Sequence, residues 1–180
     1  MNSMKNIVLI GFMGTGKTST GKLLANKLGY AFIDMDSKIE AEGKMTIKDI
    51  FARYGENYFR KKEAMLVQQI AEKKNVVVST GGGTVMNPEN MIILQKMGIV
   101  VSLTAEIDII LERTGRRGTR PVLDHADVGD RRAAIENVLA MRAAVYQQAD
   151  FIVDTSALSP MQVTEEIMRV IKKKDVGTHA

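Results

Sequence analysis

The stretch "GFMGTGKT", residues 11–18, decides the fold of this chain. Its spacing is G-x-x-x-x-G-K-[ST], with Gly11 and Gly16 as the fixed glycines, followed by Lys17 and Thr18. Glycine allows a tight turn in which successive backbone N–H groups point into one concavity and bind phosphate oxygens. The lysine would reach the outer phosphates, and the threonine hydroxyl would serve Mg²⁺. The stretch therefore predicts a site for a nucleoside triphosphate. The alternative is a glycine-rich turn without a ligand.

The residues on either side fit a phosphate-binding loop. The apolar run "NIVLI", residues 6–10, is typical of a buried strand. The segment "KTSTGKLLANKLG", residues 17–29, places leucines on one helical face and ends at Gly29, which favours a helix that stops there. The N-terminus of that helix would add a positive partial charge beneath the phosphates.

The composition limits the classes of protein to consider. A length of 180 residues, with 45% hydrophobic and 26% charged residues, is typical of one globular domain spanning residues 1–180. The net charge of +4 suits anionic ligands, while the low aromatic content of 5% argues against a base-stacking surface for nucleic acid. The absence of cysteine excludes disulfides and zinc–thiolate sites. Because the apolar runs are too short to span a membrane, we expect a cytoplasmic protein without membrane or nucleic-acid partners.

Short β-branched runs alternate with helical patterns along the chain. The expected strands are residues 6–10, 30–36, 75–80, 98–105 and 150–156, and the expected helices include 17–29, 46–55, 88–98 and 160–174. Such alternation predicts an α/β fold of three layers, with a five-stranded parallel sheet covered by helices on both faces. Residues 116–130 show no apolar period, which is typical of a functional loop.

The second expected strand ends in "DMD". Residues two apart on a strand point to the same side, so Asp34 and Asp36 are expected together at the rim where α/β sheets bind ligands. One carboxylate can bind Mg²⁺, directly or through water, and the other can accept a substrate hydroxyl. The alternative is that either aspartate caps the next helix. The third strand ends in Ser79 and Thr80, without the aspartate of many phosphate-loop enzymes, which favours Asp34 as the metal-side carboxylate.

Three glycines and several arginines are further candidates. Gly81, Gly82 and Gly83 let the backbone approach a ligand or a helix closely, although a plain tight turn is the alternative. Arg60 and Glu63 lie one helical turn apart and, on their own, read as a surface ion pair on a solvated face. Four more arginines gather around the start of the unassigned loop: Arg113, Arg116, Arg117 and Arg120. Arginine on a mobile loop can neutralise a phosphoryl group during transfer.

Together these pieces resemble the shikimate kinases, a family in the nucleoside-monophosphate-kinase-like group of phosphate-loop proteins. The matching landmarks run in family order and cover nearly the whole chain from Asn6 to Ser156. They are "GFMGTGKT", "FIDMD", "GENYFRKKE", "STGGG" and "TRPVL", followed by Arg142 before "AAVY". Thr18 stands where the family often has serine and Val122 where it often has leucine, and both changes keep the chemistry. Without the resemblance, Arg142 reads as an ordinary helix residue.

The resemblance implies that the protein transfers the γ-phosphate of ATP to the 3-hydroxyl of shikimate, in aromatic amino-acid synthesis, with Mg²⁺ as cofactor and as a monomer. It implies a substrate-binding helical segment at about 36–62 and a lid at about 116–130. The implied shikimate-binding residues are Asp36, Arg60, Gly81, Gly82, Gly83 and Arg142. The implied ATP-binding residues are Gly14, Thr15, Gly16, Lys17, Thr18, Ser19, Arg113 against the adenine, and Arg120 from the lid. Thr18 and Asp34 would serve the metal, and Lys17, Asp36 and Arg120 would be catalytic.

Three alternatives remain open at the level of sequence. A kinase of another small hydroxy acid, such as gluconate, would share most of these features. A nucleotide-dependent switch would need a water-positioning residue and a partner surface, and the sequence indicates neither. A nucleic-acid-binding module fits the basic isoelectric point, near 9.3, and little else.

Overall fold

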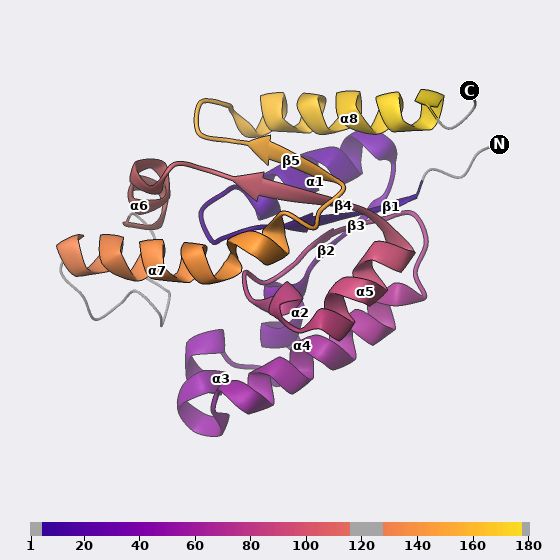
Figure 1. Ribbon diagram of the computed structural model, residues 1–180. Coiled ribbons are helices and arrows are strands. Elements are labelled where there is room, and N and C mark those ends of the chain that lie inside the picture. The colour runs from indigo at the N-terminus through magenta and orange to yellow at the C-terminus, as the bar shows by residue number, and fades with distance from the viewer. Residues whose placement is uncertain (1–4, 116–127, 178–180) are drawn as a thin grey trace.

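The computed structural model describes residues 5–115 and 128–177. Its centre is a parallel sheet of five strands in the order β2-β3-β1-β4-β5 (Figure 1). The strands are β1 Asn6–Ile10, β2 Ala31–Asp34, β3 Val76–Ser79, β4 Gly98–Thr104 and β5 Phe151–Asp154. The predicted five-stranded parallel sheet with helices on both faces is thereby confirmed.

Helices connect successive strands, as parallel pairing requires. They are α1 Lys17–Leu28, α2 Met35–Gly43, α3 Ile47–Tyr54, α4 Glu56–Ala71, the 3₁₀ turn η1 Thr84–Met86, α5 Pro88–Met97, α6 Ile107–Gly115, α7 Val128–Tyr146 and α8 Pro160–Gly177. Several begin at the polar residues that the sequence suggests. The Thr46 side chain accepts a hydrogen bond from the Asp49 backbone N–H. The side chain of Asn87, which directly precedes Pro88, accepts one from the Glu89 backbone N–H.

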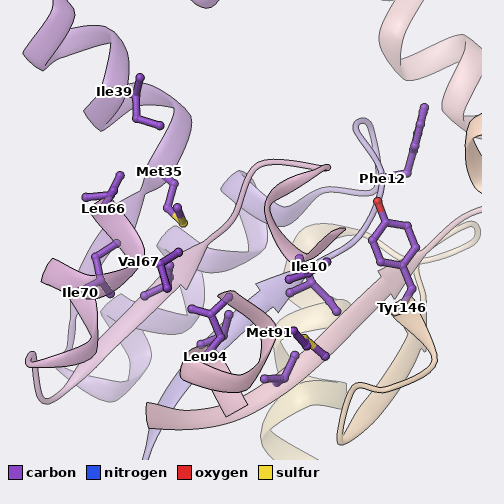
Figure 2. Close-up of a cluster of buried hydrophobic side chains, with 14 of the residues drawn as sticks. Ile10, Phe12, Met35, Ile39, Leu66, Val67, Ile70, Met91, Leu94 and Tyr146 are labelled. Carbon is purple, nitrogen blue, oxygen red and sulfur yellow. The ribbon is translucent and has the colours of Figure 1, made fainter. Parts of the chain in front are cut away.

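Alternate residues of each central strand face opposite layers. Ile7 and Leu9 of β1 pack towards α1 and α8, in a cluster that includes Leu24 and Ile167. The neighbouring residues Val8 and Ile10 face the second cluster, shown in Figure 2, to which α2, α4, α5 and α7 contribute. All of β1 is buried, so helices cover both faces of the sheet at its centre.

The second strand is shorter than the sequence pattern predicts. It ends at Asp34, and Met35 already begins α2. The Asp34 carboxylate accepts a hydrogen bond of 3.0 Å from the Ser37 backbone N–H and so forms the N-cap of that helix. The prediction that Asp34 and Asp36 lie two apart on one strand is therefore wrong. Asp34 is the last strand residue, and Asp36 lies in the first turn of α2.

The predicted lid, at about residues 116–130, is only partly described. Residues 128–130 form the start of α7, and the remainder, with Arg116, Arg117 and Arg120, lies outside the described residues. Within the described ranges, no helix combines the length and the apolar character that crossing a membrane would require.

Candidate active site

The register of the sheet brings the ends of three strands together. Asp34 at the end of β2 lies beside Ser79 at the end of β3, and Ser79 pairs with Leu9 near the end of β1. The loop "GFMGTGKT" follows β1 directly, and the glycine-rich segment 81–83 follows β3. Asp34, the phosphate loop and the glycine segment therefore meet at one edge, as expected for ligand binding in an open α/β sheet.

Glycines give the phosphate loop its shape. Gly11, Gly14 and Gly16 have φ values of +137°, +79° and +93°, which other residues rarely adopt. A Cβ atom on Gly11 would lie 2.2 Å from the backbone oxygen of Leu103, so only glycine fits there. The loop then leads into α1, whose N-terminal backbone N–H groups add a positive partial charge at the same point.

The Lys17 side chain lies across the phosphate loop. Its Nζ atom donates hydrogen bonds of 2.8 Å to the Gly11 oxygen and 2.9 Å to the Phe12 oxygen. Within the loop, the buried Thr15 hydroxyl donates a hydrogen bond of 2.7 Å to the Phe12 backbone oxygen. The lysine ammonium is thus within reach of any anion that the loop holds.

Thr18 and Asp34 form a direct contact at the mouth of the loop. The Thr18 hydroxyl donates a hydrogen bond of 2.6 Å to the Asp34 carboxylate. A hydroxyl and a carboxylate are the oxygen donors that Mg²⁺ prefers, and this ion commonly takes one or two protein ligands and completes its shell with phosphate and water. The two residues therefore fit a magnesium site shared with a nucleotide.

Each glycine of the segment 81–83 faces charged side chains. A Cβ atom on Gly81 would lie 2.7 Å from Glu63 Oε1 and 2.9 Å from Asp36 Oδ1. One on Gly82 would lie 3.0 Å from Arg142 Nη1. On Gly83, a Cβ would lie 2.7 Å from both terminal nitrogens of Arg60. The structure thus brings together all six residues predicted to bind substrate: Asp36, Arg60, Gly81, Gly82, Gly83 and Arg142.

Glu63 fixes the Arg60 guanidinium. The Glu63 carboxylate, only 1% exposed, accepts a hydrogen bond of 2.6 Å from Arg60 Nη1 and another of 2.6 Å from the Thr84 hydroxyl. Burial lowers the pKa of Arg60, but the nearby carboxylates, Glu63 before Glu56, more than offset this, so the pKa lies above its ordinary value. The pair is not the solvated surface ion pair that spacing alone suggests, since one partner is buried.

Sequence reasoning missed the role of Glu63, although a signal was present. Glu63 lies in line with Phe59, Leu66, Val67 and Ile70, which form the buried face of α4. A carboxylate in the middle of an apolar stripe needs a buried partner. That reading would have placed Glu63, and with it Arg60, on the inward side of the helix.

Arg142 reaches the glycine segment from α7. Its guanidinium lies 5.9 Å from the centre of the Phe12 ring and beside Gly82. One turn later, the buried Tyr146 donates a hydrogen bond of 2.7 Å to the Gly82 backbone oxygen. Tyr146 is a second residue that sequence reasoning passed over.

Arg113 lies on the opposite side of the phosphate loop. Its terminal nitrogens donate to the Gly14 oxygen over 3.2 Å, the Thr155 hydroxyl over 3.0 Å and the Thr155 oxygen over 2.9 Å. The Thr155 hydroxyl also lies 3.0 Å from the Thr15 oxygen. Arg113 therefore ties α6 to the phosphate loop and to the segment after β5, on the side away from the glycine segment.

Comparisons with known proteins agree with this geometry. The family model described as shikimate kinase matches residues 13–172. A shikimate kinase from Pelotomaculum thermopropionicum is 46% identical over 170 residues, which cover 94% of this chain and 97% of the relative. One from Thermodesulfovibrio yellowstonii is 44% identical over 174 residues, covering 97% and 99%.

Solved structures give the same result. Shikimate kinase from Acinetobacter baumannii in complex with shikimate superposes with a TM-score of 0.90 at 32% identity, covering 96% of this chain and 95% of that one. A gluconokinase from Sinorhizobium meliloti 1021, at 17% identity over 99% and 98% of the two chains, has a TM-score of 0.61 and shares the fold alone. With a family model matched over most of its length and relatives covered almost end to end, the chain belongs to the shikimate kinase family and is a kinase.

Proposed function

We propose that this protein transfers the γ-phosphate of ATP to the 3-hydroxyl of shikimate, giving shikimate 3-phosphate and ADP. The observation that carries the proposal is the glycine segment 81–83, whose residues face Asp36 and Glu63, Arg142 and Arg60 in turn. It lies at the same edge of the sheet as the phosphate loop. An anionic acceptor held there would present a hydroxyl to the nucleotide.

The acceptor chemistry suits the charges around the glycines. Shikimate is a small carboxylic acid with several hydroxyls. Two guanidinium groups, those of Arg60 and Arg142, can grip the carboxylate through paired hydrogen bonds. Asp36, at the other end of the segment, would accept hydrogen bonds from the hydroxyls. Because glycine has no side chain, the backbone of this segment can approach the ring closely.

In the transfer, the bond between the γ-phosphorus and its bridging oxygen breaks as the bond to the 3-hydroxyl oxygen forms. We assign Asp36 as the group that takes the hydroxyl proton, and Lys17 as the cation that stabilises charge on the γ-phosphate. Nucleotide binding is assigned to the loop residues and the start of α1, namely Gly14, Thr15, Gly16, Thr18 and Ser19.

ATP is the co-substrate of this family. We propose Mg²⁺ as the cofactor, with Thr18 and Asp34 as its protein side. When bound, the ion would neutralise charge on the phosphate oxygens of the nucleotide. In the described structure the 2.6 Å contact holds both oxygens at the mouth of the loop, ready to serve the ion or its water.

Two arginines complete the proposed nucleotide site. We assign Arg113, which contacts Gly14 and Thr155, to the adenine side of the nucleotide. Arg120 falls outside the described residues, so its role as a catalytic lid residue stays a prediction.

A coupled assay tests the proposed reaction. ADP release from ATP and Mg²⁺ should accelerate strongly on addition of shikimate and stay near background with gluconate, quinate or no acid. Mass spectrometry of the product should find one phosphate on the 3-hydroxyl. Equal rates with gluconate would contradict the acceptor assignment. Acid-independent ATP hydrolysis would instead indicate a nucleotide-dependent switch.

A further inference from the structure

Tyr146 is a buried polar side chain close to the active site for which the proposed reaction supplies no role. It ends α7, is 6% exposed, and is the only labelled residue of the cluster in Figure 2 with a side-chain oxygen. The hydroxyl lies at the end of the cluster near Phe12 (Figure 2). Packing alone would be served as well by phenylalanine, so the hydroxyl needs an explanation of its own.

The hydroxyl has two partners, and both belong to the acceptor side of the site. It donates a hydrogen bond of 2.7 Å to the backbone oxygen of Gly82, and it accepts a longer one of 3.5 Å from Arg142 Nη1. The Arg142 guanidinium in turn lies against Gly82. Tyr146, Arg142 and Gly82 therefore contact one another in pairs, and the Tyr146 hydroxyl links the Arg142 guanidinium to the Gly82 backbone oxygen.

The protonation state of the phenol supports this arrangement. Burial raises the pKa of Tyr146 above its ordinary value, and the opposing effect of Arg142 is smaller. The phenol therefore keeps its proton at neutral pH and donates it to the Gly82 oxygen. Its lone pairs stay available to the guanidinium.

We propose that Tyr146 is a positioning residue for shikimate, acting through Arg142 and the Gly82 peptide. It fixes the guanidinium in the plane needed for a two-pronged grip on the substrate carboxylate. It also sets the orientation of the peptide that forms the floor beneath the substrate. The inference rests on the proposed function, since it assigns the carboxylate of shikimate to Arg142.

The test is Tyr146→Phe, which removes only the hydroxyl and keeps the buried ring. The carboxylate is remote from the reacting hydroxyl, so its binding energy is the same in the ground state and the transition state, and its loss raises KM. We expect the KM for shikimate to rise about 3- to 30-fold, as for one hydrogen-bonded group lost in a buried site. The KM for ATP and kcat should stay within about twofold of the wild type.

A matched control separates positioning from stability. Thr164 in α8 is fully buried on the other face of the sheet, and its hydroxyl donates a hydrogen bond of 2.8 Å to the Pro160 backbone oxygen. Thr164→Val also removes one buried hydroxyl, and we expect a similar fall in melting temperature with no change in the KM for shikimate. An equal rise of both KM values in Tyr146→Phe, or none, would overturn the proposal.

The route through Arg142 is tested in a double variant. Lysine cannot make a two-pronged contact, so in an Arg142→Lys background the Tyr146→Phe effect on shikimate binding should largely disappear, as measured by calorimetry. A full effect in that background would contradict the link to Arg142.

The wild type distinguishes the two proposals. Absence of shikimate-dependent ADP release by the wild type would refute the proposed function. An active wild type with an unchanged Tyr146→Phe variant would refute only this inference. Should Tyr146→Phe not fold, calorimetry on Arg142→Lys decides: shikimate affinity within about twofold of the wild type would refute the inference, because it requires the fork that lysine lacks.

Discussion

At the scale of single residues, the phosphate loop depends most on one cation. Lys17 already rests on the Gly11 and Phe12 carbonyl oxygens, so little reorganisation separates it from a bound phosphate. We expect Lys17→Met to lower kcat on the order of 10²–10³-fold, as for the loss of one preorganised group that stabilises charge in the transition state. The coupled assay at saturating ATP and shikimate measures this. Lys22→Met, on an exposed position of the same helix, should leave kcat unchanged. Near-normal turnover of Lys17→Met would remove this lysine from the mechanism.

Asp34, at the end of β2, and Asp36, in the first turn of α2, should affect different substrates. Asp34→Asn weakens the group that faces Thr18, so use of Mg·ATP should decline and be partly restored by excess Mg²⁺. Asp36→Asn should keep ATP affinity and lose shikimate affinity by about 1–3 kcal/mol, because the substrate hydroxyls lose a strong acceptor. Loss of proton transfer would add a fall in kcat on the order of 10²–10⁴-fold. Calorimetry with each ligand alone measures both. If Asp36→Asn lost ATP binding but bound shikimate normally, the roles assigned to Asp34 and Asp36 would have to be exchanged.

On the other side of the loop, Thr155 contacts both the phosphate loop and Arg113. Its buried hydroxyl lies 3.0 Å from both the Thr15 oxygen and Arg113 Nη1. Thr155→Val keeps the shape but removes these contacts, so we expect the KM for ATP to rise about 3- to 30-fold while the KM for shikimate stays constant. Initial-rate measurements with either substrate varied will show this. A rise confined to shikimate would refute the assignment of Arg113 to the nucleotide side.

At the scale of secondary-structure elements, the strands were the most predictable parts. Runs such as "NIVLI" and "GIVVSLT" are mostly apolar because helices cover both faces of the central strands, and this signal is local in the sequence. The end of β2 was less predictable. The segment "FIDMD" fits a strand to its last residue, but Asp34 accepts a hydrogen bond from the Ser37 backbone N–H and caps α2, so the strand ends at Asp34.

The site was predictable where a motif is contiguous and not where it depends on packing. The phosphate loop is fixed by its glycines and lysine within eight residues. Arg142 has no such local signal, because its place beside Gly82 follows from how α7 crosses the sheet edge. Tyr146 was missed for the same reason, since its partner Gly82 is 64 residues away along the chain. Glu63 had a local signal in the apolar stripe of α4, but the sequence does not show its partner Thr84, which is 21 residues away.

The glycine-rich turns allow a prediction that contrasts two elements. A Cβ on Gly11 would meet the Leu103 backbone oxygen at 2.2 Å, in a left-handed conformation, and neither can relax. On Gly83, by contrast, it would meet the end of the Arg60 side chain at 2.7 Å, which can move. We expect Gly11→Ala to lose on the order of 3 kcal/mol of stability or more. Gly83→Ala should fold with a melting temperature near that of the wild type.

The functional consequence of Gly83→Ala is then specific. Displacing the Arg60 guanidinium should raise the KM for shikimate at least several-fold and leave the KM for ATP unchanged. Thermal unfolding by circular dichroism and initial rates test both variants together. A Gly83→Ala enzyme with wild-type shikimate kinetics would show that Arg60 does not hold the acceptor.

At the scale of the whole molecule, one sheet supports both substrates. The phosphate loop and the glycine segment extend from β1 and β3, which are neighbours in the sheet. Relative movement of the two sites is therefore limited by a buried parallel pairing. The helices that add Asp36 and Arg60, α2 and α4, pack on the face opposite α1 and α8.

This shared sheet predicts that the chain unfolds as one unit. Every central strand sends alternate side chains into the two clusters, so neither face can unfold while the other keeps its sheet. Leu66→Ala in α4 and Ile167→Ala in α8, both almost fully buried, should each cost about 2–5 kcal/mol. Each should lower the midpoint of a single transition, with equal calorimetric and van't Hoff enthalpies.

The control for this prediction is Ile152→Ala on β5, where the side chain is 53% exposed and the midpoint should hardly change. Scanning calorimetry of the three variants decides the question. If either core variant produced two transitions, one shifted and one at the wild-type temperature, the two faces would be separate folding units. The phosphate loop and the acceptor site would then be joined by contacts weaker than those of a continuous sheet.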